Sequence, residues 1–141
     1  MGANSVAMGV SEVFSGMQTG VIDGTENNPP TFVAHNYLPV VKNYTWSKHF
    51  IIPELFLFSK AKWDKLKKED QELILKLAKE AQAEQRELWK AYNEKSLQAM
   101  KAGGVQFHDI DTKAYYDATQ SVRHKHGNAH PDLIKRIQDA Q

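Results

Sequence analysis

The segment Asp23-Gly24-Thr25-Glu26-Asn27-Asn28 gathers carboxylate, hydroxyl and carboxamide side chains within six consecutive residues. Asn27 and Asn28 each carry two N–H donors and one acceptor oxygen, so they can bind hydroxyl and carboxylate oxygens without adding a charge. Such groups suit a polyhydroxylated anion. The alternative is an Asx-rich turn whose side chains bond to their own backbone, and composition alone favours that turn. The functional hypothesis is that this segment lines a ligand pocket and performs no catalysis.

Patterns that would indicate catalysis or calcium binding fail at a position they require. The run Gly9-Val10-Ser11-Glu12-Val13 resembles a nucleophile elbow, but valine stands where the sharp turn needs glycine. The run from Asp23 alternates oxygen side chains as a calcium loop does. It lacks the glycine of the sixth position and an acid at the twelfth, where Ala34 stands. We expect no catalytic residue and no calcium site.

Histidines cluster near the end of the chain, at His124, His126 and His130. Neutral imidazoles in this number could hold zinc or nickel. Positions i and i+2 do not share a helix face, however, and Gly127-Asn128 indicates a turn. We therefore expect no metal and no other cofactor. His49, beside Lys48, is read first as a hydrogen-bonded structural residue and second as a ligand contact.

The composition is typical of one soluble globular domain and argues against nucleic acid and anionic membranes as partners. The chain has 141 residues, 41% hydrophobic and 25% charged. Its 18 basic and 17 acidic side chains leave a formal charge of +1, so no strong positive field attracts nucleic acid or an anionic membrane. Cysteine is absent, which excludes disulfides, thiolate nucleophiles and Cys-based zinc sites. The first five residues lack the basic and apolar regions of a secretory signal.

The elements that must position the segment are helices on either side of it. Ser11 to Met17 predicts a short helix stopped by Gly20, and a second short helix is expected through Phe32, Val33 and Tyr37. Pro29-Pro30 fits either a turn or the first helical positions. Later in the chain we expect a strand at 105–107 and helices over 112–122 and 131–140.

Residues 40–58 and 69–101 predict the sheet and the longest helix. The first range is β-branched and aromatic, with an interruption at Pro53, which indicates two extended stretches. Leu55-Phe56-Leu57-Phe58 is apolar on both faces, so a strand here needs cover on both sides, as in an α/β layer. The second range repeats apolar residues at helical spacing. A helix of about 50 Å exceeds what a globule of roughly 15 Å radius of gyration can cover, so it suits a larger body.

Tandem motifs in this chain resemble one family, the solute-binding proteins of tripartite ATP-independent periplasmic (TRAP) transporters, of the dicarboxylate-binding type. The agreement in order and spacing extends through about residue 110. The matching residues are Gly2-Ala3-Asn4, Ser11-Glu12-Val13-Phe14, Gln18-Thr19-Gly20-Val21-Ile22-Asp23-Gly24-Thr25-Glu26-Asn27, His49 with Pro53, Ser59-Lys60 with Trp63-Asp64 and Leu66, Glu69-Asp70-Gln71, and Gly104-Val105.

The resemblance implies an α/β chain that is the carboxyl-terminal part of a two-lobed, helix-rich periplasmic binding fold, without its amino-terminal lobe. Its implied parts are a ligand-loop region at 1–40, lobe-crossing strands at 41–60, a long helix at 61–104 and a terminal strand with helices at 105–141. The implied location is periplasmic, and no signal peptide is expected within this stretch. Such proteins capture an organic acid for TRAP membrane subunits and are not enzymes.

The resemblance also implies a set of ligand contacts. Asn27 matches the family's polar contact, and Val10 stands where several members place an aromatic ring against the ligand. The pair Asn27-Asn28, with the stretch from His49 to Ser59, is similar to the branch that binds sugar acids such as uronates. Asp23, Gly24 and Glu26 match positions that shape the loop. The arginine that pairs with the ligand carboxylate is expected outside this chain.

Other interpretations remain open at this stage. A C4 dicarboxylate is the alternative ligand. A helical protein-interaction module built on 69–101 is the alternative function, although Glu84-Gln85 interrupts the seam that a coiled coil requires. An enzyme of unknown type is the third. We also expect a chain with so much uncovered apolar surface to self-associate.

Overall fold

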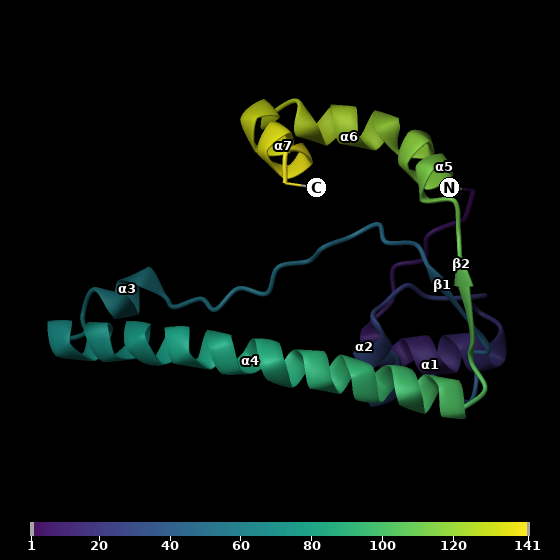
Figure 1. Ribbon diagram of the computed structural model, residues 1–141, viewed down its shortest axis with the longest axis horizontal. Coiled ribbons are helices and arrows are strands. Elements are labelled where there is room, and N and C mark those ends of the chain that lie inside the picture. The colour runs from purple at the N-terminus through teal and green to yellow at the C-terminus, as the bar shows by residue number, and fades with distance from the viewer. Residues whose placement is uncertain (1, 141) are drawn as a thin grey trace. The chain divides into compact units, whose positions relative to one another are not determined.

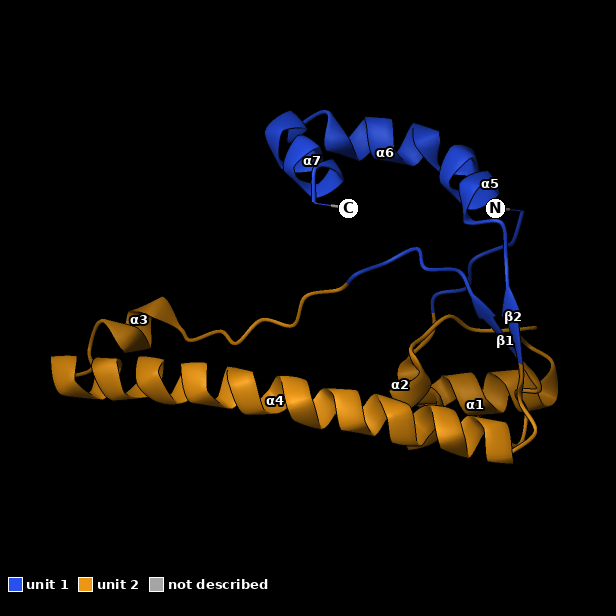
Figure 2. Cartoon of the chain, viewed as in Figure 1, with its two compact units in different colours: residues 1–7, 44–51, 107–141 blue, residues 8–43, 52–106 orange. Residues whose placement is uncertain are grey.

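The computed structural model describes residues 2–140, which divide into two compact units. Figure 2 shows the described part of unit 1 in blue, residues 2–7, 44–51 and 107–140, and unit 2 in orange, residues 8–43 and 52–106. Each unit has its own secondary structure, labelled in Figure 1. Among residues 2–140, no helix combines the length and the apolar content that a membrane crossing requires.

Unit 2 begins with α1, Val10–Thr19, which confirms the predicted helix and its stop. The Glu12 carboxylate accepts a hydrogen bond from the Gly9 backbone N–H at 3.0 Å, which satisfies one orphan donor of the first turn. The helix ends at Gly20, whose φ of 75° lies in the left-handed region that glycine adopts without a Cβ penalty. Val13 and Gly16 form its buried face.

The second helix, α2, spans Pro29–Ala34 and is shorter than predicted. Pro29 and Pro30 occupy its first positions, which decides between the two interpretations of that pair. Tyr37 lies beyond the helix because Asn36 turns the backbone into the left-handed region, with φ 55°. The Tyr37 N–H then donates to the Phe32 carbonyl at 2.9 Å, and the two rings meet edge to face at 5.4 Å. These features together define a Schellman end with its usual apolar contact.

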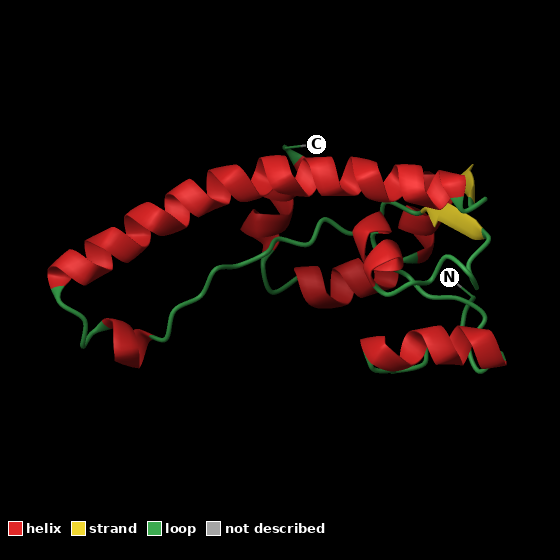
Figure 3. Ribbon diagram, turned by 90° about the horizontal axis from the view of Figure 1, so that it is seen from below, coloured by secondary structure: helices red, strands yellow, loops and turns green. Residues whose placement is uncertain are grey.

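The longest helix, α4, spans Lys68–Ala102 and confirms the helix predicted over 69–101. It curves gently along its length (Figure 3). Its last turns bury Ser96 and Met100, and α2 packs against it. Residues 79–92 are all exposed, Leu88 at 62%. A short helix, α3 at Lys60–Trp63, precedes it.

The sheet is smaller than the sequence indicated. β1, Asn43–Trp46, pairs with β2, Gln106–Asp109, in a two-stranded sheet. The predicted strand at Leu55–Phe58 is wrong for the structure described: these residues have no regular secondary structure, and Phe56 is 81% exposed. Strand geometry needs a hydrogen-bonding neighbour, and within residues 2–140 no other segment pairs with this one. The apolar side chains of α4 are exposed as well, with Leu73 at 53%, Leu77 at 52% and Leu88 at 62%.

Unit 1 contains an aromatic cluster and three short helices. Tyr44 and Trp46 of β1 contact Phe107 of β2, with ring centroids 5.7 and 6.0 Å from it. The helices are α5 at Thr112–Ala118, α6 at Gln120–Gly127 and α7 at Pro131–Gln138. The helix predicted over 112–122 is therefore two helices, and the closing helix is confirmed.

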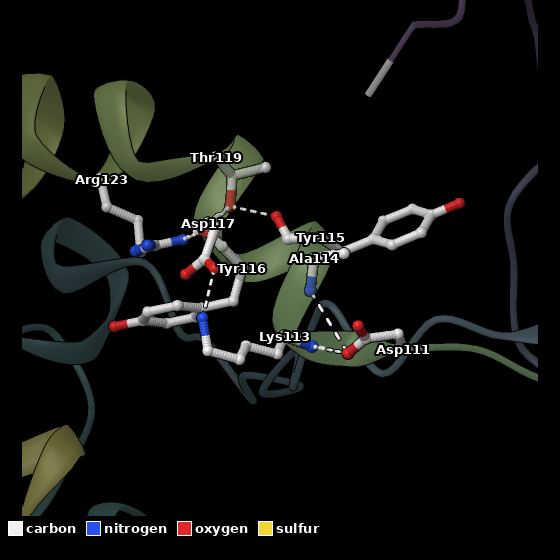
Figure 4. A network of polar contacts seen from close by, with 8 residues as sticks. All are labelled: Asp111, Lys113, Ala114, Tyr115, Tyr116, Asp117, Thr119 and Arg123. Atoms are coloured by element: carbon white, nitrogen blue, oxygen red, sulfur yellow. Dashed lines mark hydrogen bonds and ion pairs between the residues drawn. The ribbon is translucent and has the colours of Figure 1, made fainter.

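The break between α5 and α6 has a clear hydrogen-bonding cause (Figure 4). The Thr119 hydroxyl donates to the Tyr115 and Tyr116 carbonyls, at 3.0 and 3.1 Å. Arg123 donates from Nη1 to the Tyr116 carbonyl at 2.5 Å, and its guanidinium lies 3.4 Å from the centroid of the Tyr116 ring. Side chains thus satisfy the carbonyls at the end of α5, so the helix can stop there.

Candidate functional site

The candidate segment is the loop 20–28, which joins α1 to α2 within unit 2. Its amino-terminal end is held on α1: the backbone N–H groups of Val21 and Ile22 both donate to the Gly16 carbonyl, at 2.9 and 3.3 Å. The absence of a side chain at Gly16 allows the loop to lie close to α1, because an added Cβ at Gly16 would be only 3.3 Å from the Ile22 side chain. The loop is therefore anchored at its start by the carboxyl end of α1.

The carboxyl-terminal end of the loop is held by the two asparagines. The Asn27 side-chain oxygen accepts from the Asn28 backbone N–H at 2.9 Å. The Asn28 side-chain oxygen caps α2, accepting from the Thr31 backbone N–H at 3.0 Å and from the Thr31 hydroxyl at 2.9 Å. Both asparagines are exposed. The side-chain oxygens of Asn27 and Asn28 therefore make the local hydrogen bonds of an Asx-rich turn, and both residues are also exposed to solvent.

Asp23 and Gly24 lie at a small open hollow of about 280 Å³ in unit 2, at the lower end of the size of small-molecule sites. Gly24 has no left-handed φ, and an added Cβ would meet open space, so its backbone does not require glycine. The remaining lining residues are Met17, Ile22, Thr25, Phe32, Val40, Val41, Lys42 and Asn43. Asn27, Asn28, Val10 and His49 are not among them. Glu26 is exposed on the same loop.

The sequence analysis did not single out Lys42 or Thr31. Lys42 is one of the residues that line the hollow, and its ammonium donates to the Leu38 carbonyl at 3.4 Å. The position of Lys42 in the sequence does not indicate a functional role, because it simply lies between the apolar pair Val40-Val41 and the start of β1. Thr31 could have been found from the sequence, because it stands three residues after Asn28, and an asparagine followed at that spacing by a hydroxyl donor is a helix-capping pattern.

Val10 and His49 belong to different units. Val10 is the first residue of α1 in unit 2, is 49% exposed, and its carbonyl lies 3.4 Å from the hydroxyl of the buried Tyr37. His49 belongs to unit 1, where its Nδ1 is 2.6 Å from the Ser47 hydroxyl and its ring centroid is 4.5 Å from that of Phe50. These contacts are the ones expected if His49 is a hydrogen-bonded structural residue.

The terminal histidines lie around α6 and α7. His124 and His126 are in α6, and His130 is the residue before α7. Across residues 2–140, no three His, Cys, Asp or Glu side chains come together as a metal ion would require. His124 instead lines an open hollow of about 510 Å³ in unit 1, together with Tyr116 and Arg123.

Residues 1–129 match the family model described as Bacterial extracellular solute-binding protein, family 7, or DctP. The chain belongs to this family. A TRAP periplasmic solute-binding protein from Citrobacter koseri, solved with bound D-glucuronate, is 67% identical, with a TM-score of 0.92 over 99% of this chain and 46% of that chain. A second from Pseudomonas putida F1, also with D-glucuronate, is 50% identical, with a TM-score of 0.90 over 96% of this chain and 44% of that one.

A curated relative is the C4-dicarboxylate-binding periplasmic protein of Rhodobacter capsulatus, 36% identical over 78% of this chain and 33% of its own length. The chain spans less than half the length of the relatives it matches. The resemblance and the α/β, helix-rich fold class drawn from the sequence are confirmed by the family match and the solved structures.

Proposed function

We propose that this chain forms part of the extracytoplasmic solute-binding component of a TRAP transporter, which captures a sugar acid of the uronate class for uptake. The observation that carries the proposal is the 67% identity, with a TM-score of 0.92, to a solute-binding protein solved with D-glucuronate. The Rhodobacter relative makes a C4 dicarboxylate the second candidate ligand. The whole protein binds and delivers its ligand and carries out no catalysis.

In this proposal the loop 20–28 supplies polar contacts to the ligand. Asn27 and Asn28 donate hydrogen bonds to ligand oxygens, Val10 forms an apolar wall at the start of α1, and His49 contributes from residues 44–51. Asp23 and Glu26 shape the loop in this proposal, and Gly24, whose backbone does not require glycine, is left out of that role. The anchoring of the loop on Gly16 and Thr31 supports this role, since a binding loop gains affinity when little ordering is left for the ligand to induce.

The rest of the protein completes the site. An arginine outside this chain neutralises the ligand carboxylate. Ligand binding shifts a two-lobed protein toward its closed state, because the closed state binds the ligand more tightly. The closed protein then docks on TRAP membrane subunits in the periplasm. The implied division at 1–40, 41–60, 61–104 and 105–141 belongs to this proposal.

Asn27→Ala in the full-length protein that carries this chain tests the proposal. Loss of one hydrogen bond to an anionic ligand costs about 1.5–3 kcal/mol, which is a loss of affinity of about 10- to 150-fold. Titration calorimetry against D-glucuronate, D-galacturonate and succinate measures it, with the exposed amide change Gln85→Ala as the control. A wild-type protein that binds none of these acids refutes the function, and unchanged affinity in Asn27→Ala refutes the role of Asn27.

When the chain is produced alone, we further propose that it self-associates through its exposed apolar run 50–58. Ile51 is 93% exposed there, Phe56 81% and Leu57 79%. Seven apolar side chains of this run are exposed, and contiguous apolar surface of this kind marks either an interaction site or an aggregation site. The full-length protein covers the same run with its own residues.

A further inference from the structure

The hollow of about 510 Å³ in unit 1 is a groove between α6 and α7. Its lining residues on α6 are Gln120, Arg123, His124 and Gly127, and those on α7 are Pro131, Ile134, Lys135 and Gln138. Both sets recur at i, i+3, i+4 and i+7, which is the spacing of residues on one helix face. One face of each helix therefore forms the groove.

Gly127 and the turn that follows it bring these two faces together. An added Cβ at Gly127 would lie 3.3 Å from the Ile134 side chain, so a larger residue would crowd the two helices at this point. The His130 N–H donates to the Gly127 carbonyl at 2.8 Å, which closes the turn between α6 and α7. The groove is thus shaped by contacts within unit 1 itself.

Positive charge reaches this groove from both helices. Arg123 and His124 lie on α6, and Lys135 lies on α7. Lys135 is exposed, and the ion pairs described within residues 2–140 belong to other lysines. A carboxylate on the lining, that of Asp117, is ion-paired with Lys113 at 2.5 Å, which offsets its charge locally. A bound anion would balance the positive charge that remains.

Arg123 is held in place before any anion arrives (Figure 4). Its guanidinium lies 3.4 Å from the centroid of the Tyr116 ring, and its Nη1 donates to the Tyr116 carbonyl at 2.5 Å and to the Thr119 hydroxyl at 2.6 Å. Both hydrogen bonds use the same nitrogen, so Nε and Nη2 keep their N–H groups for a ligand. Because the side chain is half-buried and stacked, binding has little of its freedom left to remove.

We infer that the groove between α6 and α7 binds the phosphate group of a phosphate monoester. A carboxylate is satisfied by one guanidinium, which offers two donors in a plane. A phosphate monoester has more acceptor oxygens, arranged as a tetrahedron, and close to a second negative charge at neutral pH. Such a group needs cations and donors from several directions, as the two helices provide them here. The carboxamides of Gln120, Asn128 and Gln138 add further donors to the lining.

The size of the groove indicates that the phosphate carries an organic group. A volume of about 510 Å³ falls within the range of small-molecule sites and exceeds the need of a lone phosphate. Tyr116 and Ile134 give the lining an apolar part. A soluble phosphate ester and the headgroup of a lipid such as phosphatidic acid present the same phosphate. The groove shares no residue with the proposed sugar-acid site, so the two proposals can fail separately.

Lys135→Gln and Arg136→Gln in the full-length protein form a matched pair. Each removes one exposed cation from α7, but only Lys135 lines the groove. Titration calorimetry with glycerol 3-phosphate measures binding, against sodium chloride at equal ionic strength. Lys135→Gln is expected to weaken binding about 3- to 10-fold, and Arg136→Gln less than about 2-fold. Equal weakening by both variants would overturn the site, and so would a wild type that does not bind glycerol 3-phosphate.

Arg123→Gln is expected to lower the affinity for glycerol 3-phosphate at least about 10-fold. Arg123 also satisfies a carbonyl at the end of α5, so the melting temperature of this variant is measured alongside. If it falls, the exposed Lys135→Gln decides. Both variants should keep their affinity for D-glucuronate, and a parallel loss would show that one site takes both ligands, which overturns a separate site. A wild type that binds glycerol 3-phosphate and no sugar acid overturns the proposed function alone.

Vesicles separate the two sources of the phosphate. Co-sedimentation with phosphatidylcholine vesicles that contain phosphatidic acid, reduced in Lys135→Gln and absent with phosphatidylcholine alone, assigns the groove to a lipid headgroup. Binding of glycerol 3-phosphate without co-sedimentation assigns it to a soluble ester. Co-sedimentation that Lys135→Gln and Arg136→Gln reduce equally reflects general charge and overturns the groove as the site.

Discussion

Replacing Phe32 by alanine should destabilise the isolated chain far more than the same change at Phe56. Phe32 is 3% exposed, packs edge to face on the buried Tyr37 at 5.4 Å, and belongs to α2, which packs against α4. Emptying such a site removes the transfer free energy of the ring and leaves a cavity, which together cost about 3–5 kcal/mol. Phe56 is 81% exposed, so its removal should change the free energy of unfolding by less than about 0.5 kcal/mol.

Urea unfolding followed by far-ultraviolet circular dichroism measures both variants in one assay. The melting temperature of Phe32→Ala should fall by roughly 10–20 °C for a chain of this length. Phe32→Leu, which keeps most of the volume, should cost only about 1 kcal/mol and provides a graded control. Equal destabilisation by Phe32→Ala and Phe56→Ala would refute the assignment of the core to the contact between α2 and the end of α4.

Two further predictions concern the loop and the exposed run. Gly20→Ala should lower the free energy of unfolding by about 1–2 kcal/mol, because φ is 75° there. Gly24→Ala should leave it unchanged, because Gly24 has no left-handed φ and an added Cβ would meet open space. Thermal melts compare the two variants directly, and equal melting temperatures would contradict this reasoning. Leu57→Asp should shift the isolated chain toward its monomer mass in light scattering, because a charge opposes burial of the run 50–58. A wild-type chain that is already a monodisperse monomer at micromolar concentration would exclude the self-association.

Local sequence determined much of the two helices that flank the loop 20–28. The stop of α1 at Gly20 follows from a backbone preference that acts within one turn, so the sequence predicts it without a partner. Pro29-Pro30 allowed either a turn or a helix start, and the structure places the pair at the start of α2. The end of α2 was harder, because it depends on Asn36 adopting a left-handed φ and on Tyr37 folding back onto Phe32. The apolar period of 69–101 likewise predicted α4, since a long regular pattern gives a helix whatever covers it.

Tertiary structure decided what the sequence left open. The run Leu55–Phe58 has the composition of a buried strand, but a strand exists only where another backbone pairs with it, and the described chain pairs β1 with β2 alone. The local bonding of the Asn27 and Asn28 carboxamides was open in the same way. Composition gave each residue both kinds of group, and the folded backbone engaged the oxygens. Side-chain chemistry is written in the sequence, but the folded backbone decides which donors and acceptors come within hydrogen-bonding distance of one another.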